Sequence, residues 1–231
     1  MSQQSPPKKP SSNQPAPTEP QIFWRIPQWF PDLPPATQAQ LKMFHDELIK
    51  ANKTMTLIST KTVSMADALH FADSILASRE IAKTPGIAEI YDFGSGNGFP
   101  GLIYALLHPK VKVILVDSDP RKAEFLKMMI HKLGLKNASL HIGPIEGLPE
   151  HSVQFAMSRG FAPIAKAILF TRRIFKTGGR YFHLKSEEWA SEVGQIPTQL
   201  CSFWSPSLVG EYKLPVGEVR FAVIQTEKTA D

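Results

Sequence analysis

A glycine-rich loop between an apolar strand and a helix is the feature that most limits what this chain can fold into. Residues 87–93 form a short apolar run, and Asp92-Phe93-Gly94-Ser95-Gly96-Asn97-Gly98-Phe99-Pro100-Gly101 spans its end. Glycine lets the backbone take turns that a Cβ would forbid and lets it approach a ligand closely. In open α/β sheets, ligands bind beyond the carboxyl ends of the strands. The loop therefore predicts a ligand site at the end of the first strand.

Strand and helix patterns alternate downstream of this loop. Later apolar runs are strand-like, at 111–116, 138–142, 153–157 and 180–184. Helical patterns lie between them, at 100–108, 120–134 and 163–175. This alternation predicts an α/β fold with a mostly parallel, twisted sheet. The two last runs, 208–214 and 219–225, flank Pro215-Val216-Gly217-Glu218, which indicates an antiparallel hairpin at the end of the chain.

Composition divides the chain into three parts. Residues 1–21 are rich in Pro, Ser and Gln and almost free of apolar residues, so we expect a disordered tail. Residues 22–85 begin with an aromatic cluster, which we expect to pack as an extended segment on the core rather than to stack on RNA. Two helical patterns follow it, with Leu41, Phe44 and Leu48 on the face of the first and Met65 to Arg79 in the second. Residues 86–231 form the predicted core domain.

Composition also excludes several classes of site. One cysteine, Cys201, cannot form an intramolecular disulfide, and the seven histidines lack ligand spacing, so we expect no metal. No apolar run resembles a signal peptide or a membrane span, which favours a cytoplasmic protein without a membrane partner. The net charge of +5 suits a polyanionic partner, although many basic proteins never bind nucleic acid.

The spacing of the glycines separates the candidate ligands. A dinucleotide-binding loop needs Gly-x-Gly-x-x-Gly, whereas here Gly98 comes one residue early, and no Gly-Lys-Ser/Thr is present for a P-loop. Gly94-x-Gly96-x-Gly98 after an acidic-ended strand is instead the pattern of class I methyltransferases. Asp117, at the end of the second strand, can accept both hydroxyls of a ribose. The competing role for Asp117, capping the next helix, is already available to Asp119 and Ser118.

From about Asn52 onward the sequence resembles a bacterial family, the small-subunit ribosomal RNA methyltransferase G family, also called glucose-inhibited division protein B. The residues that carry the resemblance are the cofactor loop 94–101, Leu115-Val116-Asp117-Ser118 with Lys122 and Phe125-Leu126, Met157-Ser158-Arg159-Gly160-Phe161-Ala162, Leu184-Lys185 and His70-Phe71-Ala72-Asp73-Ser74. The resemblance implies a class I Rossmann-like methyltransferase with N-terminal helices.

By resemblance, the chain transfers a methyl group from S-adenosylmethionine to N7 of a guanine in 16S ribosomal RNA, with the RNA or the small subunit as partner. Arg159 would be the catalytic residue and would also contact the cofactor. The other implied cofactor-binding residues are Gly94, Gly96, Gly98, Phe99, Asp117, Ile145 and Glu146. We expect a monomer that leaves S-adenosylhomocysteine as its product.

Departures from the family pattern fall on polar and basic positions. Thr56-Leu57-Ile58 replaces the usual Asn-Leu-Thr. Leu69, Pro144 and Val219 stand where the family often has arginine, and Ser186 stands where it commonly has glycine. Two alternatives therefore stay open: a ribosome-associated module that binds cofactor without activity, and a methyltransferase with another acceptor. His70 and Asp73, three residues apart on one helix, can bond each other either as a structural lock or as part of a binding site. Lys185 can contact RNA phosphate or remain solvated.

Overall fold

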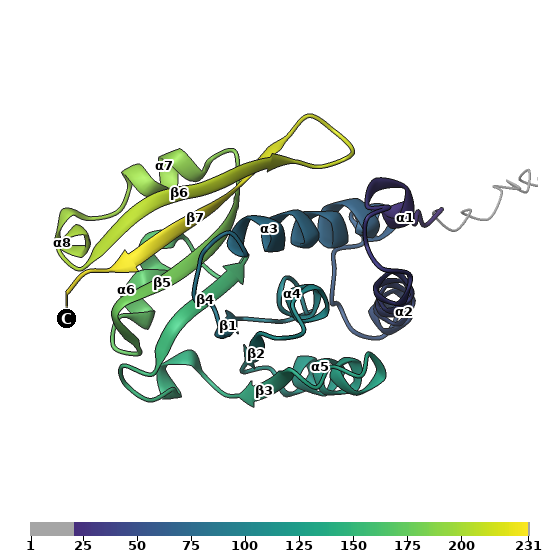
Figure 1. Cartoon of the computed structure of the whole chain (residues 1–231), viewed down its shortest axis with the longest axis horizontal. Helices are drawn as coiled ribbons and strands as arrows, with labels where there is room; N and C mark the ends of the chain where they lie inside the picture. The colour runs from purple at the N-terminus through teal and green to yellow at the C-terminus, as the bar shows by residue number, and fades with distance from the viewer. Residues whose placement is uncertain (1–20, 231) are drawn as a thin grey trace, which may run out of the picture.

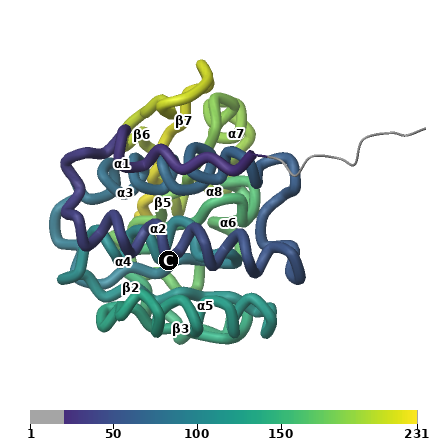
Figure 2. Tube along the Cα trace, turned by 90° about the vertical axis from the view of Figure 1, so that its right-hand side faces the viewer, coloured from purple at the N-terminus to yellow at the C-terminus, as the bar shows by residue number. Residues whose placement is uncertain are grey.

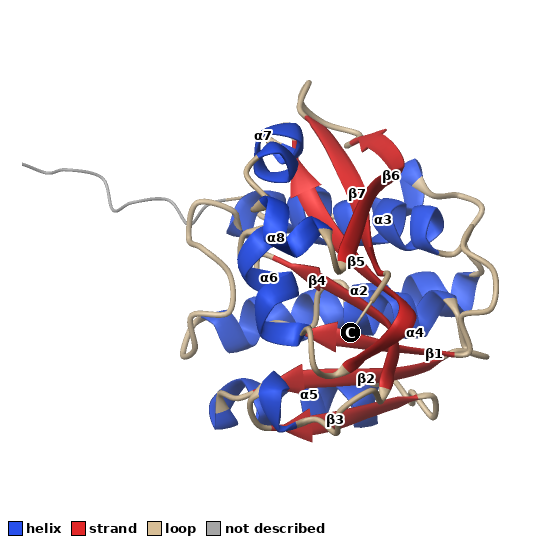
Figure 3. Cartoon of the chain, turned by 90° about the vertical axis from the view of Figure 1, so that its left-hand side faces the viewer, coloured by secondary structure: helices blue, strands red, loops and turns tan. Residues whose placement is uncertain are grey.

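The computed structural model describes residues 21–230, and the expected disordered tail lies, apart from Gln21, outside the described residues. Seven strands form one sheet in the order β3-β2-β1-β4-β5-β7-β6 (Figure 3). Their bounds are β1 (Glu89–Phe93), β2 (Lys112–Asp117), β3 (Ala138–Ile142), β4 (Val153–Arg159), β5 (Phe175–Ser186), β6 (Trp204–Lys213) and β7 (Arg220–Lys228). This arrangement confirms the expected α/β fold.

The sheet is parallel from β3 to β5 and antiparallel at its other end. β1 pairs in parallel with both β2 and β4, so chain order reverses beside β1. β7 runs antiparallel to β5 and to β6, which confirms the predicted C-terminal hairpin. The strand expected at 180–184 is longer, because β5 begins at Phe175, where that residue pairs with Val153 before a register shift. The preceding helix therefore ends earlier than residue 175.

Helices cover both faces of the sheet (Figure 1). Their bounds are α1 (Ile26–Trp29), α2 (Pro35–Asn52), α3 (Asp73–Ile81), α4 (Gly101–Leu107), α5 (Pro120–Lys132), α6 (Ile164–Thr171), α7 (Trp189–Gly194) and α8 (Thr198–Cys201). One apolar cluster joins residues of α2, α3, α4 and α5 to the sheet, and a second joins α6 to the opposite face. Burying each face against helices removes the apolar strand side chains from water.

The second N-terminal helix contains a wider turn than its periodicity predicts. A 3₁₀ turn (Val63–Met65) and a π-helical turn (Asp67–Ala72) precede α3, where a regular helix was expected. Within the π turn, the Leu69 carbonyl accepts a hydrogen bond of 3.0 Å from the Arg159 guanidinium. A side chain that enters the backbone ladder is a known cause of such irregularity, and π turns often mark functional sites.

The aromatic N-terminal segment packs on this helical layer (Figure 2). Phe30 is buried, and the Trp24 ring lies 4.8 Å from the His45 ring and 5.3 Å from the Phe71 ring. The expected packing on the core is therefore observed. The segment is not wholly extended, however, because Ile26–Trp29 form one turn of helix, which Pro27 at its first turn favours. The division of the chain into parts at residues 21 and 85 stays a prediction.

Candidate active site

The glycine loop is held against the end of β2 by its own backbone. The N–H groups of Gly94 and Ser95 donate to the Val116 carbonyl at 2.9 and 3.0 Å. The Ser95 hydroxyl donates to the Asp92 carbonyl at 2.8 Å and accepts from the Val116 N–H at 3.0 Å. These bonds span two neighbouring strands, so the loop is fixed at the edge where the sheet reverses its strand order.

Different structural constraints favour glycine at the different positions of the loop. A Cβ on Gly98 would lie 2.4 Å from Leu102, and one on Gly101 would lie 2.3 Å from Leu115, so these two allow close packing of α4. Gly96 differs, because its φ is +50° and the atom nearest to the position that a Cβ would take is 3.6 Å away. A Cβ on Gly96 would therefore make ordinary contacts without a clash, and the positive φ is what favours glycine there.

Asp117 braces this loop from the end of β2. Its Oδ2 accepts from the Gly96 N–H at 2.7 Å, and its Oδ1 accepts from the Asp119 N–H at 2.8 Å. Capping of α5 falls instead to Asp119, whose side chain accepts from the Arg121 N–H at 2.9 Å. The carboxylate of Asp117 also lines a cavity. Each of its oxygens can accept more than one hydrogen bond, so the carboxylate can bind both the loop and a ligand hydroxyl.

A first cavity, of about 250 Å³, opens beside the ends of β2 and β3. Backbone and side chains of the strand-end loops form most of its wall, and the rings of Phe161 and Phe170 complete it. The expected residues Gly94, Asp117, Ile145 and Glu146 all line it. The walls also include Val116, Ser118, Gly143 and Pro144.

A second cavity, of about 350 Å³, lies on the other side of the glycine loop. It opens at the ends of β4 and β5 and is bounded by the π turn and the start of β7. Its lining residues are Leu69, Asp73, Asn97, Arg159, Gly160, Leu184, Lys185, Ser186 and Phe221. Because Gly94 lines the first cavity and Asn97 the second, the loop Gly94–Asn97 runs between the two.

Arg159 is fixed in the second cavity by three acceptors. Its guanidinium donates to the Leu69 carbonyl at 3.0 Å, to Oδ2 of Asp73 at 3.1 Å and to Nδ1 of His70 at 2.9 Å. The other carboxylate oxygen of Asp73 accepts from the Tyr212 hydroxyl at 2.7 Å. His70 and Asp73 therefore do not bond each other as the sequence suggested, because both bond Arg159, and the buried carboxylate links β4 to β6.

The protonation of His70 follows from these contacts. Burial, reinforced by the Arg159 charge, lowers the pKa of His70 to about 3. The ring is therefore neutral at physiological pH, and Nδ1 accepts from Arg159 while Nε2 carries the proton toward the Thr62 hydroxyl 3.1 Å away. A neutral histidine leaves Arg159 with a single anionic partner in this group, Asp73.

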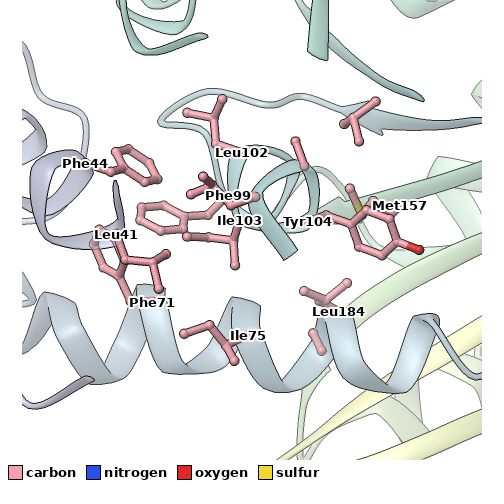
Figure 4. Packing of buried hydrophobic residues seen from close by; sticks show 14 of the residues in the cluster. Leu41, Phe44, Phe71, Ile75, Phe99, Leu102, Ile103, Tyr104, Met157 and Leu184 are labelled. Atoms are coloured by element: carbon pink, nitrogen blue, oxygen red, sulfur yellow. The ribbon is translucent and has the colours of Figure 1, made fainter. Parts of the chain in front are cut away.

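Phe99 packs in the apolar core near Phe44 and Phe71 (Figure 4). Its ring is 2% exposed and stacks on Phe44 at 4.9 Å and on His70 at 5.5 Å, with the Arg159 guanidinium 5.2 Å above it. The ring supports Arg159 and does not line either cavity. The expected contact of Phe99 with the cofactor stays a prediction.

Asp92, at the end of β1, is fully buried below the loop. Its Oδ2 accepts from the Gly101 N–H at 3.1 Å, while Oδ1 has no partner among the described residues. Burial raises the pKa of Asp92 to about 7, against the lowering effect of its hydrogen bonds. The carboxyl is thus a titratable group near neutral pH in the floor of the site.

Lys185 reaches the second cavity but its ammonium is engaged elsewhere. It donates to Oε2 of Glu192 at 2.7 Å and to the Ala162 carbonyl at 3.0 Å. The same Glu192 oxygen accepts from the Ile164 N–H at 3.0 Å. These bonds tie β5 to α6 and α7, so they favour a structural role for Lys185 over the RNA contact considered from the sequence.

Within residues 21–230, no group of His, Cys, Asp and Glu side chains is arranged to hold a metal ion. No helix in that range has the length and apolar character needed to cross a membrane.

Comparison with known proteins decides the family. The model of the rRNA small subunit methyltransferase G family matches residues 37–204. The ribosomal RNA small subunit methyltransferase G 3 of Bdellovibrio bacteriovorus is 55% identical over 212 residues, which cover 91% of this chain and 96% of that protein. The chain belongs to the rRNA small subunit methyltransferase G family. It is therefore a methyltransferase, and S-adenosylmethionine is the cofactor of this family, as expected from the loop.

The family match begins upstream of Asn52, where the sequence resemblance starts, and takes in most of α2. A more distant relative, the ribosomal RNA small subunit methyltransferase G of Paracoccus denitrificans, is 33% identical over 64% of this chain and 76% of its own length. The part of the chain that matches the family therefore includes the helices that pack beside Arg159.

Solved structures agree on the fold. The YcgJ protein of Bacillus subtilis superposes with a TM-score of 0.52 at 15% identity, over 70% of this chain and all of that one. A SAM-dependent methyltransferase from Aquifex aeolicus gives 0.50 at 18% identity, over 65% and 89% of the two chains. The expected class I Rossmann-like methyltransferase fold is confirmed.

Proposed function

We propose that this methyltransferase transfers a methyl group from S-adenosylmethionine to N7 of a guanine in 16S ribosomal RNA. The observation that carries the proposal is the pair of cavities on the two sides of one glycine loop, with a fixed arginine in the second. A cofactor with a nucleoside at one end and an amino acid at the other needs two connected sites. The names of the family and of its relatives supply the class of acceptor.

The nucleoside of the cofactor would occupy the first cavity. Asp117 would accept ribose hydroxyls there, and Ile145 and Glu146 would flank the adenine. Gly96 fits this role, because its N–H donates to the Asp117 carboxylate at 2.7 Å and so holds the loop beside it. Gly94 and Gly98 would shape the backbone under the amino-acid arm, beside Phe99.

Arg159 would bind the carboxylate end of the cofactor at the boundary of the second cavity. Its three protein acceptors hold the guanidinium plane in place, and arginine has five N–H donors, so donors remain for a ligand. A fixed guanidinium is suited to a carboxylate because it offers two parallel N–H groups. The role of Arg159 is thus to orient the methyl donor.

The chemistry asks little of the protein beyond orientation. The cofactor supplies an electrophilic methyl group on a sulfonium. The guanine N7 lone pair forms the new N–C bond while the C–S bond breaks, and the electron pair stays on sulfur. No proton leaves N7, so no general base is needed, and holding the reactants in line can account for about 7–11 kcal/mol.

A transfer assay tests the proposal. Labelled S-adenosylmethionine is incubated with the protein and with small subunits, naked 16S RNA, large subunits or a mixture of small molecules and proteins. The proposal predicts label in 16S RNA. Salt-sensitive RNA binding without label would support the inactive module, and label in another acceptor would support the second alternative.

The site of action follows from the substrate. Because small ribosomal subunits are in the cytoplasm, we propose that the protein works there. We also propose that it acts as a monomer. Sedimentation of the protein with and without subunits measures this directly.

A further inference from the structure

Phe221 is the only aromatic side chain among the described residues that line the second cavity. It is the second residue of β7 and pairs with Ser186 of β5, which lines the same cavity. The ring is partly exposed, and Asn97 of the glycine loop lines the same cavity. With the cofactor placed as proposed, an aromatic face in this cavity would be near the methyl group.

The ring of Phe221 is held in place by Tyr212. The two rings lie 5.9 Å apart and are inclined by only 15°, which is a near-parallel stack. Tyr212 is itself buried, and its hydroxyl donates to Asp73 at 2.7 Å. Asp73 also accepts from Arg159, so one buried carboxylate fixes both the guanidinium and the aromatic wall of the cavity.

We propose that Phe221 stacks on the guanine that receives the methyl group, and that Tyr212 is a positioning residue for its ring. This inference rests on the proposed function. A base that reacts in a pocket must leave its stack in the RNA, and stacking on a protein ring replaces part of that energy. The cavity of about 350 Å³ falls in the size range of pockets for small ligands.

Stacking suits this reaction because it leaves the edge of the base free. A hydrogen-bond donor aimed at N7 would occupy the lone pair that attacks the methyl group. A ring against the face of the guanine orients the base without touching N7. The competing role for Phe221 is simple packing of the hairpin on the core, and this role would not involve the RNA.

Matched substitutions on the hairpin separate the two roles. Phe221→Ala removes the ring, Phe221→Trp keeps an aromatic face, and Leu208→Ala truncates a 46% exposed apolar side chain on β6 outside the cavity. We expect Phe221→Ala to lower kcat/KM for the small subunit by about 5- to 150-fold, chiefly through a higher KM. Phe221→Trp should retain most activity, and Leu208→Ala all of it.

Cofactor affinity is the control measurement. The Kd for S-adenosylhomocysteine, measured by calorimetry, should stay within about twofold in all three variants, because Phe221 lies outside the first cavity, where the nucleoside would bind, and its ring has no hydrogen-bond donor for the carboxylate end of the cofactor. Tyr212→Phe keeps the ring but breaks the bond to Asp73, so it should lower kcat/KM less than Phe221→Ala.

Three outcomes overturn the proposal: unchanged kcat/KM in Phe221→Ala, an equal loss in Phe221→Trp, or a loss that follows cofactor affinity. Failure of the proposed function is a separate result, because it would appear in the unmodified protein as label outside guanine N7. If label reaches a non-nucleotide acceptor and depends on Phe221, the ring belongs to an acceptor site but not to a guanine site.

Discussion

The two cavities beside the glycine loop are built in different ways. The first is formed by strand-end loops of β1, β2, β3 and β4, and its key contacts are backbone groups such as the Gly96 N–H on Asp117. The second brings together residues of the π turn, β4, β5 and β7, and its Arg159 shares one buried carboxylate, Asp73, with Tyr212 of β6. A site built on backbone tolerates changes in side chains, whereas a site built on a buried charge depends on every partner of that charge.

Arg159→Ala should have the largest effect and should be specific to the second cavity. The substitution leaves Asp73 buried with Tyr212 as its remaining partner, which should cost roughly 3–5 kcal/mol of unfolding free energy. Methyl transfer should fall by about 100-fold or more, since the cofactor loses a fixed donor. Urea unfolding and a transfer assay measure the two effects.

The double variant Arg159→Ala/Asp73→Asn provides the control. Removing the stranded charge should recover most of the stability but none of the activity. Recovery of both would mean that Arg159 acts only through Asp73 and does not contact a ligand.

Gly96→Leu should break the first cavity without unfolding the protein. The new side chain would lie against the Asp117 carboxylate, whose Oδ2 is 3.9 Å from the Cβ position, so affinity for S-adenosylmethionine should fall by at least about 100-fold. Gly134→Leu is a matched control, because its φ of +65° imposes similar backbone strain and no atom lies within 4 Å of its Cβ position. Calorimetry and thermal unfolding of both variants would show equal losses of stability but unequal affinities.

Undiminished cofactor affinity in Gly96→Leu would place the nucleoside elsewhere. It would also remove the distinction drawn between the two cavities.

Asp92→Asn should remove the free-energy cost of ionising this buried carboxyl. The raised pKa of about 7 means that the folded protein holds this proton more tightly than the unfolded chain does. The stabilising effect is therefore complete below the unfolded pKa, near 4, and is lost as pH rises toward 7. The stability of the Asn variant relative to the parent should rise by roughly 2 kcal/mol from about pH 5.5 to about pH 7.5. A difference that is flat with pH would contradict the titration of Asp92 in this range.

Lys185→Ala should have the smallest effect. The Lys185 ion pair with Glu192 is partly exposed, and such pairs contribute about 0–1 kcal/mol. RNA affinity, measured by filter binding at low salt, should change little, because the ammonium already has two acceptors. A loss of RNA affinity of tenfold or more would show that Lys185 leaves Glu192 to bind phosphate.

The contrast between the two cavities also explains which features could be predicted from the sequence. The glycine loop, Asp117 and the capping of α5 by Asp119 are local patterns, and the fold followed from alternating strands and helices. Asp117 is an exception in detail, since the sequence did not show that it also braces Gly96. The roles of the cofactor residues stay predictions: Gly94, Asp117, Ile145 and Glu146 line the first cavity, Arg159 lines the second, and Gly96, Gly98 and Phe99 line neither.

The second cavity could not be predicted because its contacts join distant parts of the chain. Tyr212 lies 139 residues from Asp73 in the sequence, and no local pattern links them. Phe221 reads in the sequence as one apolar residue of a strand. The π turn was also missed, because its apolar spacing is close to that of a regular helix and its contact with Arg159 is long-range. The placement of Phe99 in the core follows likewise from tertiary packing.

Mapping the methylated nucleotide is the most direct test of the central claim. Small subunits are treated with the protein and S-adenosylmethionine, and their 16S RNA is then exposed to borohydride and aniline, which cleave at 7-methylguanine. Our account predicts one new cleavage, dependent on the cofactor and absent with Arg159→Ala. Incorporation of labelled methyl groups into the RNA without a new cleavage would contradict the N7 assignment, and no incorporation would contradict the activity itself.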